Sequence, residues 1–125
     1  MIANPSDQPT SQPTTEGVGK DFFFVHANYK QVKLFCDDVL YIQGLKDYVK
    51  IFTDTQSKAI LTRHNLKGME AILPPGRFIR VHNSFIVNAN KITAFQKNHV
   101  FIRQNTIPIG EKFATRFKTG YGIGQ

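Results

Sequence analysis

From Asp21 onward the chain is a series of short apolar or alternating runs, each closed by turn-forming residues. Residues 22–26 are rich in aromatic side chains and lead into a turn over residues 27–30, and residues 39–43 end at a turn over residues 44–47. Runs of this length suit β-strands better than helices. Because such turns join neighbouring strands as hairpins, we expect the sheets to be antiparallel.

The pattern as a whole predicts a mainly β protein with about ten short strands in several small antiparallel sheets. Strands are expected at residues 22–26, 31–36, 39–43, 48–53, 58–62, 91–95, 99–103 and 106–109, and in the segment 78–88. The strand at residues 106–109 contains Pro108, which cannot donate a hydrogen bond to a neighbouring strand. This strand therefore belongs at the edge of a sheet.

Two short helices interrupt the strands. Asn65 is suited to cap the first helix, which should end at residues 74–76, where two prolines precede a glycine. Its expected apolar stripe consists of Leu66, Met69, Ile72 and Leu73. The second helix is expected over residues 111–119, where Phe113 and Phe117 are four residues apart.

The segment 78–88 mixes large apolar side chains with Arg80, His82, Asn83 and Ser84. On a single strand without a bulge, Phe78, Arg80 and His82 would share one face. Such a strand would anchor itself by its apolar residues and present Arg80, His82 and Asn83 to an anionic or hydrogen-bonding partner. Equally, His82 and Ser84 at a strand end would satisfy neighbouring backbone groups, and the segment alone does not decide between these interpretations.

The chain is basic, with 16 Lys and Arg against nine Asp and Glu, a formal net charge of +7. Residues 1–20 carry Asp7 and Glu16 against Lys20, so the positive excess belongs to the rest of the chain. A basic folded domain favours an anionic partner such as nucleic acid, although many domains are basic for solubility alone. Residues 1–20 contain three prolines among polar residues and are expected to be a flexible linker or tail.

Several functional classes are disfavoured. Cys36 is the one cysteine, so the chain cannot form an internal disulfide or a cysteine-rich zinc site, and we expect a reducing cytoplasm. No signal peptide or membrane-spanning run is recognisable. The four histidines are scattered and no glycine-rich phosphate loop is present, so we expect neither an enzyme nor a metal or cofactor site.

Cationic and polar residues recur at the expected turns. They are Lys46 and Asp47, then Arg63, His64 and Asn65, then Arg80, His82 and Asn83, and finally Lys112, Arg116 and Lys118. Lys and Arg neutralise phosphates, while Asn, His and Arg can also read base edges. Any one of them is an ordinary solvated surface residue, but their recurrence favours a binding surface for nucleic acid.

The chain from about Phe22 to Lys118 resembles the LytTR DNA-binding domain of bacterial LytR/AlgR-type response regulators. Three blocks carry the resemblance: residues 39–44 with 47–51, residues 66–73 with 78–88, and residues 107–110 before the last helix. The resemblance implies an elongated fold of about ten strands whose loops, rather than a helix-turn-helix, enter successive major grooves. The middle block would lie against the DNA backbone between those grooves.

Carried over by position, the resemblance assigns DNA contacts to Lys46, Asp47 and Tyr48, then to Arg80, His82 and Asn83, and then to Glu111 and Lys112. The expected turns add Arg63, His64 and Arg116 as candidate contacts. The chain departs from the family pattern at Asn83, where arginine is common, and at Glu111, where arginine or serine-arginine is common. Lys112 is therefore the expected contact at the last helix.

The expected function is sequence-specific binding of double-stranded DNA by the output domain of a bacterial two-component transcriptional regulator. The resemblance implies that two copies bind direct repeats and that a receiver domain precedes residues 1–20 in the parent protein. The binding domain would span residues 21–119, followed by a frayed tail over residues 120–125. Two alternatives stay open: a protein-interaction module that uses an exposed sheet edge, and RNA binding through the aromatic residues 22–24.

Overall fold

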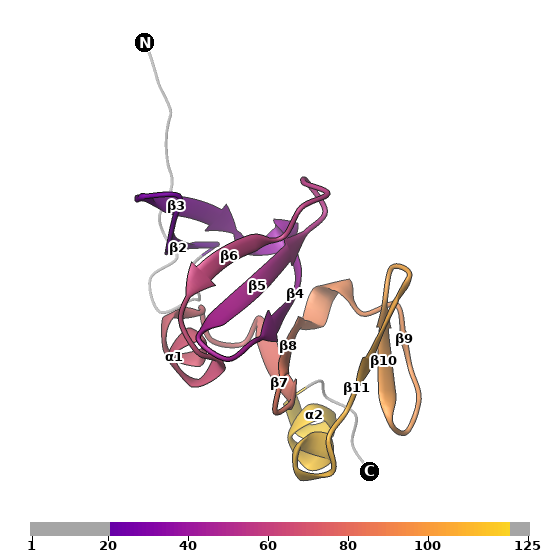
Figure 1. Cartoon of the computed structure of the whole chain (residues 1–125). Helices are drawn as coiled ribbons and strands as arrows, with labels where there is room; N and C mark the ends of the chain where they lie inside the picture. The colour runs from indigo at the N-terminus through magenta and orange to yellow at the C-terminus, as the bar shows by residue number, and fades with distance from the viewer. Residues whose placement is uncertain (1–20, 121–125) are drawn as a thin grey trace.

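The structure, a computed structural model, describes residues 21–120, which form ten strands in three antiparallel sheets together with two short helices (Figure 1). This architecture confirms the expected mainly β fold. The linker expected at residues 1–20, and residues 121–125 of the tail expected at residues 120–125, lie outside the described residues. Gly120, the first residue of the expected tail, is the last residue of the second helix.

The strands are β2 (Phe22–Ala27), β3 (Lys30–Phe35), β4 (Val39–Gly44), β5 (Tyr48–Thr53), β6 (Ile60–Arg63), β7 (Phe78–His82), β8 (Phe85–Asn88), β9 (Ala94–Phe95), β10 (His99–Ile102) and β11 (Asn105–Pro108). The helices are α1 (Leu66–Ile72) and α2 (Ala114–Gly120). Short 3-10 turns cover Cys36–Asp38, Ala89–Lys91 and Glu111–Phe113.

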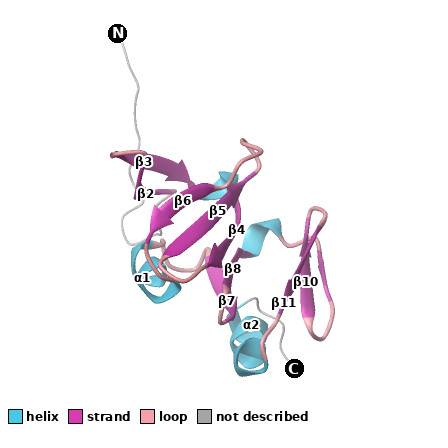
Figure 2. Ribbon diagram, in the orientation of Figure 1, coloured by secondary structure: helices cyan, strands magenta, loops and turns pink. Residues whose placement is uncertain are grey.

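A five-stranded sheet in the order β6-β5-β4-β8-β7 forms the centre of the molecule. The β2–β3 hairpin lies on one side of this sheet and the β11-β10-β9 sheet on the other, as Figure 2 shows. β11 is an edge strand, so Pro108 interrupts no ladder between two neighbours.

Two apolar clusters bury the two faces of the central sheet. The first includes Phe23, Leu34, Ile42, Ile51 and Met69, so it joins the sheet to the hairpin and to α1. The second consists of Leu40, Tyr41, Val81, Val87, Val100, Ile102, Ile107 and Phe117, and it joins the sheet to β10, β11 and α2. Burial on both faces explains the continuous apolar run at residues 39–42, because a central strand covered on both sides needs no polar face.

Several local expectations are confirmed. β5 has the bounds expected from its alternating pattern, residues 48–53. The β2–β3 turn contains Asn28 and Tyr29 with φ angles of 54° and 65°, the left-handed conformation that a two-residue hairpin turn of this type needs. The Asn65 side chain accepts a hydrogen bond from the Gly68 N–H at 2.7 Å and so caps α1.

The segment 78–88 is not one regular strand. It is a hairpin in which β7 and β8 pair antiparallel, and the register shifts between Arg80 and His82 because of a bulge. Consequently Arg80 and His82 turn to different neighbours: Arg80 to Glu70 on α1, and the His82 ring to Phe85 at 5.7 Å between centroids. A bulge redirects side chains in this way because it breaks the two-residue alternation of a strand.

Three further expectations are corrected. Ile72 is 40% exposed, so the buried stripe of the first helix reduces to Leu66, Met69 and Leu73. The strand expected at residues 91–95 shrinks to Ala94–Phe95, because the Asn88 side chain accepts from Asn90 N–H at 3.0 Å and stabilises the preceding 3-10 turn. The terminal helix expected over residues 111–119 begins as a 3-10 turn and becomes α-helical at Ala114.

Cys36 lies in the 3-10 turn after β3 rather than in the strand, and it is 1% exposed. Burial raises the pKa of its thiol. A raised pKa keeps the thiol protonated at neutral pH, which suits a small buried apolar residue and not a nucleophile.

Candidate nucleic-acid interface

The β4–β5 loop presents Lys46 and Asp47 to solvent. It is closed by a hydrogen bond from Leu45 N–H to Tyr48 O at 2.8 Å. A second bond, from His64 N–H to Asp47 O at 3.2 Å, ties it to the corner between β6 and α1. Two turns that are separate in the sequence therefore lie side by side.

At that corner, Arg63 pairs with Tyr48 across the strands, and its guanidinium carbon lies 5.5 Å from the centre of the Tyr48 ring. His64 Nδ1 accepts a hydrogen bond from Asn65 N–H at 3.1 Å. The His64 ring lies against Gly68, where an added Cβ would overlap ring atom Cε1. Glycine at position 68 thus allows the imidazole to lie close to the first turn of α1.

Two adjoining hollows connect these turns with the β7–β8 turn. The first, of about 380 Å³, is lined by Lys46, Asp47, Arg63, His64 and Asn65. The second, of about 480 Å³, shares Lys46 and Asn65 and adds Lys67, Arg80, Asn83 and Ser84, together with Gly44, Leu45 and Leu66. The β4–β5 loop, the β6–α1 corner and the β7–β8 turn therefore form one continuous concave surface.

Arg80 uses its guanidinium within the protein. Nε donates to His82 O and Nη2 to Asn83 O, both at 2.8 Å, and Nη1 donates to Glu70 Oε2 at 2.6 Å. Its side chain is 15% exposed. Arg80 therefore holds the carbonyl groups of the β7–β8 turn, and a direct contact between Arg80 and DNA stays a prediction.

The β7–β8 turn presents the amide of Asn83, which is exposed. The turn is anchored by a hydrogen bond from Gly44 N–H to Ser84 O at 2.8 Å. His82 Nδ1 accepts from Ser84 N–H at 3.0 Å, so a neutral His82 carries its proton on Nε2. His82 thus accepts a hydrogen bond from a neighbouring backbone group, as one of the two sequence interpretations expected. A contact between His82 and DNA stays a prediction.

The segment before α2 lies against the same hairpin. Gly110 N–H donates to Val81 O at 2.7 Å, next to the bulge in β7. Lys112 is exposed in the following 3-10 turn, and Arg116, 54% exposed, donates to Glu70 Oε1 at 3.1 Å. The last helix is therefore connected to the β7–β8 hairpin and to α1.

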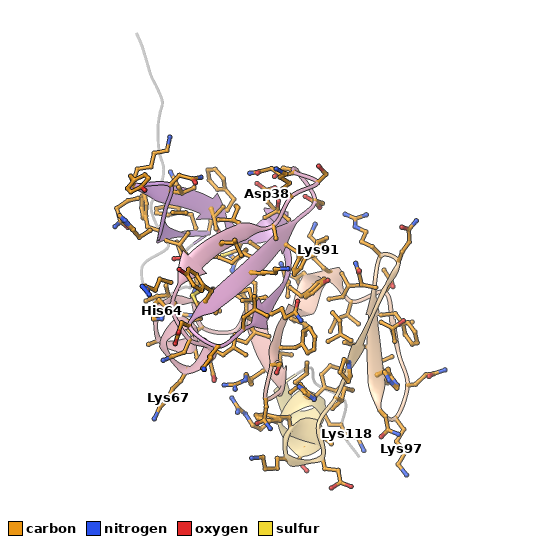
Figure 3. All side chains as sticks on the ribbon, viewed as in Figure 1. Asp38, His64, Lys67, Lys91, Lys97 and Lys118 are labelled. Carbon is orange, nitrogen blue, oxygen red and sulfur yellow. The ribbon has the colours of Figure 1, made fainter. Side chains whose placement is uncertain are left out.

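Apart from Glu111, which is exposed at the start of the 3-10 turn before α2, the ten other predicted site residues divide into four groups. Lys46, Asp47, Arg63, His64, Arg80 and Asn83 line the two hollows. The Tyr48 ring lies beside the Arg63 guanidinium, His82 lies within the β7–β8 hairpin, and Lys112 and Arg116 follow on the adjoining C-terminal segment. In Figure 3, Lys67 and Lys118 are labelled on the lower side of the view and His64 at about mid-height on the left, whereas Asp38 lies near the top.

Sequence reasoning missed Lys67 and Glu70. Lys67 lines the second hollow beside Lys46 and Asn83. Its position two residues after the capping Asn65 could have revealed it, because side chains in the first turn of a helix share the surface of the preceding corner. No sequence signal pointed to Glu70, whose partners Arg80 and Arg116 are ten and 46 residues away along the chain.

Exposed lysines around an amide and an imidazole suit a ligand that offers phosphates together with hydrogen-bonding edges. Within residues 21–120, no cluster of His, Cys, Asp and Glu is arranged to bind a metal ion. None of the helices in this part of the chain is long and apolar enough to cross a membrane.

The model of the LytTr DNA-binding domain family matches residues 29–121 of the chain. The sensory transduction proteins LytT of Bacillus anthracis and of Bacillus cereus are each 32% identical to it over 88 residues, which cover 66% of this chain and 35% of each relative. The chain thus spans about a third of the length of the curated relatives it matches.

A solved LytTr DNA-binding domain from Bacillus cereus has the same fold. It superimposes with a TM-score of 0.68 over 83% of this chain and 99% of that domain, at 22% sequence identity.

Proposed function

The chain belongs to the family of LytTr DNA-binding domains, and from this premise we propose that it binds double-stranded DNA sequence-specifically, as the output domain of a bacterial transcriptional regulator. The observation that carries the proposal is the continuous surface on which Lys46, Lys67 and Asn83 lie together. Such a surface offers both kinds of contact that a specific DNA complex uses: cations for the phosphates and an amide for a base edge.

The proposed role of each residue in DNA binding follows from its exposure and its hydrogen bonds. Asn83 reads a base in the major groove, since its amide is exposed at a turn whose backbone is held by Arg80 and Gly44. Lys46, Lys67 and Lys112 contact phosphates, because their ammonium groups are exposed. The remaining proposed contacts, which border these positions, are Asp47, Tyr48, Arg63, His64, Arg80, His82 and Arg116.

The proposed arrangement on DNA is two copies on direct repeats, with loops of each copy in successive grooves. The lengths of the relatives are compatible with a further domain in the parent protein, and we propose a receiver domain upstream of residues 21–119, linked by residues 1–20. The proposed location is the bacterial cytoplasm. No enzymatic activity is part of the proposal.

Selection from random duplexes tests the proposal directly. We expect a defined motif that occurs twice in the same orientation, bound with an affinity that falls steeply with salt. Lys46→Ala and Lys112→Ala should each reduce the slope of log K against log salt by about 1, because each variant removes one phosphate contact.

The matched control is Lys58→Ala, which removes an equal charge from the exposed loop between β5 and β6. This variant should leave the salt slope unchanged. Equal slopes for all three variants would show that the lysines act only through net charge, and the absence of any selected motif would refute sequence-specific binding.

A second candidate function, a protein-interaction module, draws on the β2–β3 hairpin. Phe24 and Phe35 are 49% and 48% exposed, and Lys33 lies 5.0 Å from the centre of the Phe35 ring. β3 is also an edge strand in this part of the chain. If duplex DNA binds weakly and without salt dependence while Phe24→Ser abolishes the capture of a protein partner, this second function would replace the first.

A further inference from the structure

One carboxylate connects the two elements that the proposed function depends on, the β7–β8 turn and the 3-10 turn Glu111–Phe113. We infer that Glu70 is a positioning residue that fixes these two elements relative to each other. Asn83 and Lys112 then contact DNA at a fixed distance and orientation from one another. The inference rests on the proposed function and deepens it, because Glu70 acts through Arg80 and Arg116 rather than by touching DNA.

Glu70 divides its two oxygens between two elements. Oε2 accepts from Arg80 Nη1 of β7 at 2.6 Å, and Oε1 accepts from Arg116 Nη2 of α2 at 3.1 Å. Glu70 follows Met69, which is fully buried in the first apolar cluster, so the core fixes the start of this side chain. Hydrogen bonds between charged groups are directional, and a carboxylate with both oxygens in use holds both guanidinium groups in place.

Arg80 extends the connection to the base-reading turn. Its other nitrogens donate to His82 O and Asn83 O, at 2.8 Å each. The guanidinium therefore links Glu70 to the backbone of the residue whose side chain is proposed to read a base. Without Glu70, Arg80 would lose the bond that orients it from the side of α1.

Phe113 and Gly110 extend the connection to the last helix. The Phe113 ring lies near both guanidinium groups, with its centre 5.4 Å from Arg80 Cζ and 5.5 Å from Arg116 Cζ. Phe113 directly follows Lys112, and the Gly110 N–H bond to Val81 O closes the same segment against β7. The position of Lys112 thus depends on the same cluster that holds Asn83.

Removing the charge of Glu70 should affect specific and non-specific binding differently. Two guanidinium groups beside one ring repel each other when the carboxylate between them is neutral. Arg116, already half-exposed, would then be able to follow phosphates of any sequence, which maintains or raises non-specific affinity. Specific affinity would fall because Asn83 and Lys112 are no longer held in one register.

The test compares Glu70→Gln with Asp38→Asn on the selected duplex and on a scrambled duplex at one salt concentration. Both substitutions remove one negative charge, and Asp38 lies away from the proposed interface, near the top of Figure 3. We expect Glu70→Gln to lower the ratio of specific to non-specific affinity by about tenfold, the size of coupling found within one bonded network. Asp38→Asn should leave that ratio unchanged.

A second readout needs no DNA. In ¹⁵N correlation spectra, Glu70→Gln should shift the Arg80 Nε resonance and the amide resonances of Asn83 and Lys112, whereas Asp38→Asn should leave all three in place. If Glu70→Gln does not fold, Arg116→Gln breaks only the α2 half of the bridge, and it should shift the Lys112 resonance as well as lower the affinity ratio.

The outcomes separate the two proposals. A wild-type protein with no preference for the selected duplex would refute the proposed function itself. A wild-type preference that Glu70→Gln leaves at the level of Asp38→Asn would refute only the positioning role. An equal rise in both affinities would likewise overturn it, because Glu70 would then act as a simple counter-charge.

Discussion

Glu70 and Asp54 each bind two cationic side chains, but at opposite ends of the central sheet. Glu70 joins Arg80 and Arg116 near the end of β4 that bonds to the β7–β8 turn through Gly44. Asp54 accepts from Lys91 Nζ at 3.3 Å and Arg103 Nη2 at 2.8 Å, near the start of β4, where Asp54 N–H bonds to Asp38 O. One arrangement borders the proposed DNA surface and the other joins the central sheet to the three-stranded sheet.

The same contrast holds for two asparagines of one hairpin. The side chain of Asn88 is buried and donates to Cys36 O and Val39 O, at 2.8 Å each, while its oxygen accepts from Asn90 N–H. The side chain of Asn83, five residues earlier, is exposed. At one end of the hairpin the amide bonds to buried backbone groups, and at the other it is exposed at the position proposed to contact DNA.

Residue type alone therefore does not reveal the role of a side chain in this fold. A carboxylate between two cations, or an amide in a β-hairpin, acquires its role from the elements that it connects. Substitutions at the two ends should therefore separate cleanly into effects on stability and effects on DNA binding.

The largest effect is expected for Asn88→Ala. It leaves two buried carbonyl groups and one N–H without their hydrogen-bond partner, which should lower the free energy of unfolding by about 3 kcal/mol. Urea denaturation measures the loss, and Asn90→Ala, an exposed neighbour, is the control. If both variants are equally stable, the buried amide does not have the structural role assigned to it.

Asn83→Ala should weaken DNA binding and leave the stability of the fold almost unchanged, the reverse of what is expected for Asn88→Ala. We expect a loss of roughly 1–3 kcal/mol in binding to the selected duplex and a smaller loss on random DNA, because one base contact is removed. The free energy of unfolding should change by less than about 0.5 kcal/mol, since the Asn83 side chain is exposed. Equal losses on both DNAs would reject a base-reading role.

Asp54→Asn should have the smallest effect, a loss of less than about 1 kcal/mol in the free energy of unfolding at neutral pH. Desolvation alone would raise the pKa of Asp54, but the hydrogen bonds and charges of Lys91 and Arg103 outweigh it and lower that pKa below its usual value of 3.8. The ionised carboxylate therefore stabilises the fold above that value, and the contribution disappears as the pH falls through the lowered pKa.

The pH dependence supplies the check. The difference in stability between wild type and Asp54→Asn should be present near pH 7 and should vanish once the pH falls below the lowered pKa of Asp54, where both forms are uncharged at this position. Binding to the selected duplex at neutral pH should be unchanged. A change in DNA sequence specificity in Asp54→Asn would contradict the claim that the Asp54 end of the sheet affects stability alone.

Much of the fold follows from the sequence because strand alternation and turn chemistry are local. The β5 strand was expected with its observed bounds, and the cap at Asn65 was expected from residue type alone. The bulge in β7 could not be predicted, since Arg80-Val81-His82 carries no glycine to mark it. Ile72 matched the helical period but faces outward, because α1 is short and only its other apolar residues reach the core.

The candidate site was predictable only in part. The turns that supply Lys46 and Asn83 were visible because they border apolar strands, but their meeting in one hollow depends on the packing of β4 against β8. Glu70 could not be found, since the bridge to Arg80 and Arg116 exists only after α1, β7 and α2 have packed together.

The most direct test of the account is a titration of the ¹⁵N-labelled domain with its selected duplex, followed residue by residue in correlation spectra. We expect the proposed DNA surface to show the largest changes, at Lys46, Lys67, Asn83 and Lys112, with little change at Lys58, Asn90 and the β2–β3 hairpin. Changes centred on the hairpin or on the Asp54 end, with Lys46 and Asn83 unaffected, would contradict it.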